Sequence, residues 1–188
     1  MNRFVLLCAV LAATALAGPH LATPAARLDA TSASIDLRTN GVLAHVCKGG
    51  YGDAILVDLK RVSDAELFRI AIDPRVRTPG AVVLQQLPPG NYTPTRLFLG
   101  GNDPVPFSSD TFEIRANRIT SFGTIKVDPQ TNLLGQLKRL VVKTDTLDIA
   151  PRLRTTGDPR LDSLPVAPQP IDWKVEPQEI PVGKRLSP

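Results

Sequence analysis

The residues most capable of taking part in chemistry are His45 and Cys47, which stand two apart in the sequence. On an extended strand, side chains two apart emerge on the same face, so this pair could form a thiolate and imidazole couple or supply two metal ligands. Asp53 and Asp58 could add carboxylates, but their spacing does not require it. Because no third ligand or orienting carboxylate stands at a motif spacing, we interpret Cys47 as a small buried residue and His45 as a core or edge residue.

Other patterns associated with catalysis are weak or missing in this sequence. The run Gly49-Gly50-Tyr51-Gly52 lacks a following Lys-Ser or Lys-Thr pair and a predicted helix, so we expect a hairpin loop with Tyr51 as a candidate interaction residue at its tip. Asp64 and Glu66 stand beside a predicted turn, where carboxylates usually act as caps. The sequence contains no GxSxG, HExxH or CxxC pattern. We therefore predict a protein that is not an enzyme, with no catalytic residue, metal ligand or cofactor.

The N-terminus, residues 1–17, has the anatomy of a secretory signal peptide. A basic residue, Arg3, precedes an apolar stretch that runs to Leu16, and a small-x-small cleavage signal ends at Ala17. We predict cleavage after Ala17 and a periplasmic or secreted protein. The apolar stretch is shorter than the roughly 20 residues of a membrane-spanning helix, so no integral membrane segment is expected after cleavage. Cleavage also removes Cys8, which would leave Cys47 without an intramolecular partner.

The composition argues against a helical bundle and against nucleic acid as a partner. The chain has 188 residues, of which 18 are Pro and 13 are Gly. Pro and Gly are both unfavourable inside helices. The 22 basic and 18 acidic side chains nearly balance, and the basic ones occur in scattered pairs such as Lys60-Arg61 and Lys138-Arg139. Nucleic acid binding needs a dense basic stripe, so no nucleic acid partner is expected.

The elements that would position these residues are strands. Residues 34–150 carry short apolar runs with two-residue alternation, separated by Gly, Pro, Asn and Asp at intervals of about 8–12 residues. This pattern predicts an all-β, antiparallel two-sheet sandwich. The predicted strands cover 35–37, 41–46, 54–62, 67–72, 81–87, 92–99, 112–115, 119–127 and 137–149, the last as a partly buried central strand.

Two appendages flank this predicted domain. Residues 18–33 show no full strand and are expected to form a flexible approach segment. Residues 151–188 are Pro-rich and are expected to form an extended tail, in which Asp158 and Pro159 predict one short helical turn. Trp173 either anchors this tail on the sandwich through its large apolar area or is an exposed interaction residue for a partner protein.

Two motifs resemble those of a known family. The first is Leu87-Pro88-Pro89-Gly90-Asn91-Tyr92, an LxPGxY turn between two predicted strands. The second runs from Phe112 to Ile125 and includes the turn Ala116-Asn117-Arg118, in which Asn stands where Gly is usual and can take the left-handed conformation of a tight hairpin. Together they resemble transthyretin-like, carboxypeptidase-regulatory-like domains of small exported bacterial proteins. The resemblance implies a prealbumin/Ig-like sandwich that is usually non-catalytic.

These observations predict a non-catalytic, exported cell-envelope protein that acts as a binding or interaction module. Its partner would be an unknown envelope protein or a glycan. One alternative is a small-ligand or glycan-binding domain that uses Tyr51, Tyr92 and the loop around Asn102-Asp103. A less favoured alternative is a thiol- or metal-dependent activity at His45 and Cys47.

Overall fold

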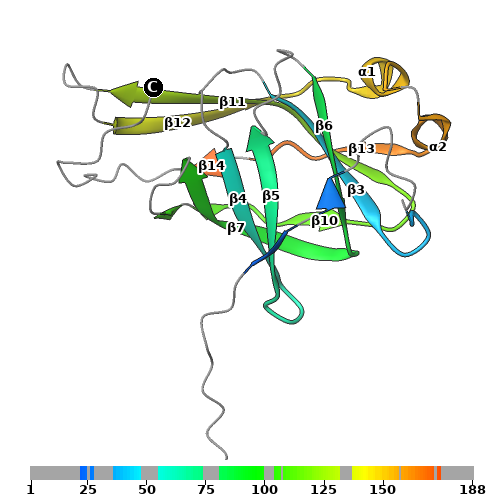
Figure 1. The fold of residues 1–188 in the computed structure, drawn as a ribbon, viewed down its shortest axis with the longest axis horizontal. Helices are drawn as coiled ribbons and strands as arrows, with labels where there is room; N and C mark the ends of the chain where they lie inside the picture. The colour runs from blue at the N-terminus through cyan, green and yellow to red at the C-terminus, as the bar shows by residue number, and fades with distance from the viewer. Residues whose placement is uncertain are drawn as a thin grey trace, which may run out of the picture.

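The structure is a computed structural model. The structure describes residues 22–24, 26–27, 36–47, 55–73, 81–99, 104–106, 108–131, 137–156, 158–171 and 173–174. The described chain is mostly β and contains two large sheets that share one apolar core (Figure 1). This arrangement agrees with the predicted all-β class. The predicted signal peptide, residues 1–17, lies outside the described residues.

In the first sheet, the neighbouring pairs β5–β4, β4–β7 and β7–β10 are antiparallel. Its order is β1-β5-β4-β7-β10, and β8 pairs with β7 beyond this path. The small strand β1 is parallel to β5. The bounds are β1 (Thr23–Pro24), β4 (Ile55–Arg61), β5 (Leu67–Asp73), β7 (Gly90–Leu99), β8 (Val105–Pro106) and β10 (Phe112–Ile114).

The second sheet is mixed, so the predicted antiparallel arrangement is wrong for this half of the fold. Its order is β12-β11-β3-β6-β2, and β13 also pairs with β11. The parallel pairs are β3 with β11 and β13 with β11. Strand β12 lies at the edge of this order, whereas the sequence predicted a central strand. The bounds are β2 (Ala26–Arg27), β3 (Gly41–Cys47), β6 (Val82–Leu87), β11 (Ile119–Thr131), β12 (Leu137–Asp145) and β13 (Val166–Pro168).

The core between the sheets follows from alternation along the strands. Ile55, Val57 and Leu59 of β4 are buried, as are Phe68, Ile70 and Ile72 of β5, which confirms the faces predicted for these two strands. An aromatic row crosses this core, with ring centroids 4.7 to 6.2 Å apart along the series Phe68, Tyr92, Phe112, Phe122 and Trp173. Such contacts stabilise the packing of one sheet on the other.

The sequence predicted an extended tail for the C-terminal segment. Its described part packs through buried leucines on the second sheet and through Ile171 and Trp173 in the core between the sheets. It forms α1 (Ala150–Arg154), α2 (Pro159–Asp162), β13 and β14 (Trp173–Lys174), and β14 pairs with β9 (Ser108–Ser109). Its buried leucines pack against the outer side chains of β3 in a second apolar cluster. The members contributed by the segment and by β3 are Leu153, Leu161, Leu164, Val42, Ala44 and Val46. Apolar burial therefore holds this segment in place.

Local geometry matches several sequence expectations. The Asp158 side chain accepts a hydrogen bond from the Arg160 backbone N–H at 3.0 Å, which confirms the predicted cap of the short helix α2. Asn117 has φ of 56°, as predicted, but its turn carries the chain from β10 in one sheet to β11 in the other and is no hairpin. The run predicted at 35–37 is a turn at Asp36 and Leu37, because the Asp36 carboxylate accepts from the Arg38 backbone N–H.

Segments expected to be mobile also contribute to the sheets. Within 18–33, β1 extends the first sheet and β2 extends the second. Gln169 of the C-terminal segment donates its backbone N–H to Ser121 of β11, and its side-chain oxygen accepts from Glu113 of β10. Both ends of the domain thus contact both sheets.

Candidate functional site

His45, the first candidate from the sequence, is fully buried between the two sheets. Its Nε2 lies 2.8 Å from the carbonyl oxygen of Ile72 on β5. A carbonyl only accepts hydrogen bonds, so Nε2 carries the proton and donates. Burial lowers the pKa of His45 to about 4, against an ordinary value of 6.5. The imidazole is therefore neutral near pH 7 and joins one sheet to the other.

Within the described part of the chain, no further metal ligand joins His45 and Cys47. Cys47 is half-buried at the end of β3. Asp58 belongs to the other sheet and is engaged by arginines, as described below, and Asp53 lies outside the described residues. Among the residues that the structure describes, no group of three or more His, Cys, Asp or Glu side chains is placed to hold a metal ion.

The aromatic candidates Tyr92 and Trp173 are buried and have structural roles. Tyr92 is fully buried, and its hydroxyl donates to the Pro88 carbonyl at 2.7 Å, closing the LPPGNY turn. Burial raises the pKa of Tyr92 to about 12. Trp173 is only 6% exposed and packs edge-on against Phe122, so the structure supports its anchoring role over the exposed one. Tyr51 and the loop residues at 102–103 lie outside the described residues.

A cluster that the sequence did not predict lies at the centre of the first sheet. Asp58 of β4 is flanked in register by Arg69 of β5 and Arg96 of β7. Arg69 binds the carboxylate through Nε at 2.7 Å and Nη2 at 3.2 Å, and Arg96 binds it through Nη2 at 3.0 Å. The Asp58 side chain is fully buried, while the Arg69 and Arg96 side chains are 34% and 40% exposed.

Strand alternation explains why these three residues converge. Val57 and Leu59 point into the core, so Asp58 between them points to the outer side of the sheet. A carboxylate buried there would be costly without partners, and directly opposed residues on both neighbouring strands supply two guanidinium groups. Hydrogen bonding to Asp58 raises the pKa of Arg69. The Arg69 guanidinium also lies 4.2 Å from the centroid of the Phe98 ring, at a cation–π distance.

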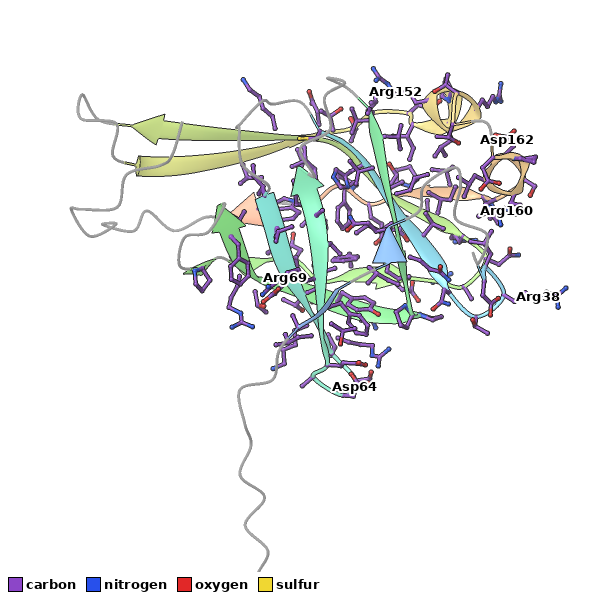
Figure 2. The ribbon with its side chains drawn as sticks, viewed as in Figure 1. Arg38, Asp64, Arg69, Arg152, Arg160 and Asp162 are labelled. Atoms are coloured by element: carbon purple, nitrogen blue, oxygen red, sulfur yellow. The ribbon has the colours of Figure 1, made fainter. Side chains whose placement is uncertain are left out.

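We call the outer side of strands β4, β5 and β7 the open face. Besides Asp58, it is made of side chains that share register positions and are exposed or half-buried: Leu56, Lys60, Leu67, Arg69, Ala71, Thr93, Arg96 and Phe98. In contrast, the outer side of the second sheet is covered by the helical C-terminal segment. Figure 2 shows Arg69 over the first sheet and Asp162 on α2, at the other side of the view.

The β4–β5 turn at the end of the open face carries a local ion-pair network. Arg61 contacts both Asp64, at 2.6 Å, and Glu66. Asp64 also accepts from the Glu66 backbone N–H at 3.1 Å. Hydrogen bonding to Arg61 lowers the pKa of Asp64. These acids therefore stabilise the turn, as the sequence predicted.

A groove with a volume of about 320 Å³ lies where β13 leaves the edge of β11 and β12 begins to pair with it. Its polar lining is sparse, and two of its polar side chains are already engaged: Ser121 Oγ accepts from the Gly123 backbone N–H, and Asp148 accepts from the Ala150 N–H. A binding pocket normally presents a few convergent polar groups to fix its ligand. The open face, which presents cationic groups, is therefore the stronger candidate site.

Comparisons with protein-family models, curated proteins and solved structures give no match for this chain. Within the described residues, no helix combines the length and the apolar character needed to cross a membrane.

Proposed function

We propose that this protein is a non-catalytic, exported β-sandwich module that binds a partner in the cell envelope through the open face. The asymmetry between the two sheets is the observation that carries the proposal. The C-terminal segment covers the outer side of the second sheet, whereas every described side chain on the open face other than Asp58 keeps some contact with solvent. The open face also concentrates Lys60, Arg69 and Arg96 around a single acid.

We assign the module to the transthyretin-like class as part of this proposal. Immunoglobulin constant-type domains place their first two strands in the same sheet, in the order ABED. Here the first long strand, β3, pairs with β6 and β11, and the second, β4, belongs to the other sheet. This order favours the transthyretin-like interpretation over the Ig-like one. The Tyr92 to Pro88 hydrogen bond gives the LPPGNY motif a structural role in the corner between β6 and β7.

Export can be tested directly with the full chain in a bacterial host. The proposal predicts that periplasmic or secreted fractions contain a protein whose intact mass is that of the chain starting at Gly18. A control variant, Leu11→Arg, interrupts the apolar stretch of the leader and should leave the protein unprocessed inside the cell. Recovery of unprocessed wild-type protein only from the cytoplasm would contradict the proposal.

A further inference from the structure

We propose that the open face binds carboxylate groups of an acidic polysaccharide, with Arg96 and Arg69 as the principal contacts and Lys60 as a second cationic position. This inference depends on the proposed function and names its ligand class. It is carried by the arrangement of guanidinium groups around Asp58 and by their exposure to solvent.

Unused hydrogen-bond donors provide the first argument. A guanidinium group has five N–H donors. The contacts with Asp58 engage Nε and Nη2 of Arg69 but only Nη2 of Arg96. Both side chains are more than one-third exposed, so the remaining donors of Arg96 in particular can reach a ligand from solvent. Guanidinium groups favour carboxylates because two parallel N–H donors match the two carboxylate oxygens.

Charge provides the second argument and favours separated single charges, as on a polymer of carboxylates, over one phosphate. Two arginines and one aspartate leave a single excess positive charge in the cluster. A carboxylate carries one negative charge, whereas a phosphate monoester carries about 1.5 to 2 near pH 7. Lys60 is exposed and lies two residues from Asp58 on β4, which places its backbone about 7 Å away along the strand. Repeated carboxylates on a polymer could contact both positions.

The location of the site favours a polysaccharide over a peptide. Extended peptides are recognised through a sheet edge or a groove, where their backbone groups find partners. Asp58 lies on β4, which is paired on both sides by β5 and β7, so the backbone groups of the central strand are already used in the sheet. A polysaccharide lying on this face can keep its hydroxyl groups in water and present its carboxylates to the arginines.

Calorimetric titration of the mature chain with a galacturonate oligomer tests this proposal. The matched ligand is the same oligomer with methyl-esterified carboxylates, which should bind about tenfold more weakly or not at all. The variant Arg96→Gln should weaken galacturonate binding about tenfold. Arg38→Gln removes one exposed charge away from the open face and should change the affinity by less than about twofold.

A second variant keeps the test decisive if Arg96→Gln does not fold, as judged by circular dichroism. Lys60→Gln changes an exposed side chain and should weaken binding about threefold. The proposal is overturned by equal binding of the esterified oligomer, by folded variants that bind like wild type, or by an equal loss in Arg38→Gln. Tighter binding of a glutamate oligomer than of the galacturonate oligomer would overturn the assignment to a polysaccharide. If the mature chain begins at Gly18 but does not bind galacturonate, only the ligand assignment is rejected. The proposal of export would stand.

Discussion

The His45 imidazole on β3 donates a hydrogen bond from Nε2 to the Ile72 carbonyl on β5, across the core and between the two sheets. A second cross-sheet contact lies beside it, because the Gln85 side chain of β6 accepts from the Ala71 backbone N–H at 2.6 Å and donates to the Ala71 carbonyl at 2.9 Å. Within the described residues, strand β1 pairs with β5 at Phe68 and Arg69 alone. Side chains from the opposite sheet therefore supply hydrogen bonds to backbone groups at the edge of β5.

Replacing His45 with Leu should lower the free energy of unfolding by about 2 kcal/mol, because the buried Ile72 carbonyl would lose its donor. Gln85→Leu should cost about twice as much, since it leaves two backbone groups of Ala71 without partners. Urea denaturation measures both effects. His45→Gln retains an amide donor and should lose less than His45→Leu. Equal stability of wild type and both Leu variants would contradict the proposed cross-sheet contacts.

Stability should also depend on pH through His45. Its pKa is about 4 in the folded protein and 6.5 ordinarily, so the unfolded chain takes up the proton first as the pH falls. The contribution of this group is complete above pH 6.5 and is lost as the pH falls towards 4. Between pH 7 and pH 5 the loss should be about 2 kcal/mol.

Among the described residues, the acidic groups whose pKa also shifts have lowered values, so their contribution is lost only below their ordinary values of 3.8 to 4.5. Unfolding curves at pH 7, 6 and 5 therefore isolate the histidine. The dependence of the free energy of unfolding on pH should disappear in His45→Gln and persist in the control variant His20→Gln. A pH-independent wild-type stability over this range would show that His45 titrates alike in both states.

Trp173→Ala should destabilise the protein by about 3–5 kcal/mol, the usual cost of removing a large buried aromatic side chain. Trp173 closes the aromatic row against Phe122 and belongs to the core between the sheets. Pro168 is exposed in the same segment, and Pro168→Ala should change the stability by less than about 0.5 kcal/mol. Urea midpoints compare the two variants. If both variants lost equally little stability, the C-terminal segment would contribute little to the core.

Asn117 tests the turn between β10 and β11. Its φ of 56° lies in the left-handed region, which Gly and Asn adopt with little strain. Asn117→Gly should leave stability nearly unchanged, whereas Asn117→Ala should cost about 1–2 kcal/mol. Thermal unfolding of the two variants measures this difference. A larger loss with Gly than with Ala would show that the Asn side chain, and not its backbone conformation, holds the turn.

Local signals predicted much of the fold. Alternation located β4 and β5 and their buried faces, Asn117 showed the left-handed turn, and Asp158 marked the start of α2. These signals depend on neighbours in the sequence. The parallel pairing of β3 with β11 could not be predicted in this way, because it joins segments far apart in the chain. The apolar residues of the C-terminal segment, such as Leu153 and Leu161, are separated by prolines and turns, so they show no periodicity although they pack on β3.

The candidate site was harder to predict than the strands. Asp58 between two inward-facing residues was a usable signal, since a polar outward position in a buried strand needs partners. Its partners Arg69 and Arg96 could be identified only once the register of β4 with β5 and β7 was known. Conversely, His45 and Cys47 were correctly placed on one strand, but the cross-sheet contact of His45 with Ile72 depends on packing.

Photo-crosslinking in living cells tests whether the open face binds envelope polysaccharide, as we propose. A photoreactive amino acid is placed at position 60 on the open face or, as a control, at position 162 on α2, which is also exposed. We predict that irradiation links position 60 to envelope polysaccharide, and that Arg96→Gln in the same chain removes this product. Crosslinks to envelope material from position 162 with none from position 60 would contradict the assignment of the open face as the binding surface.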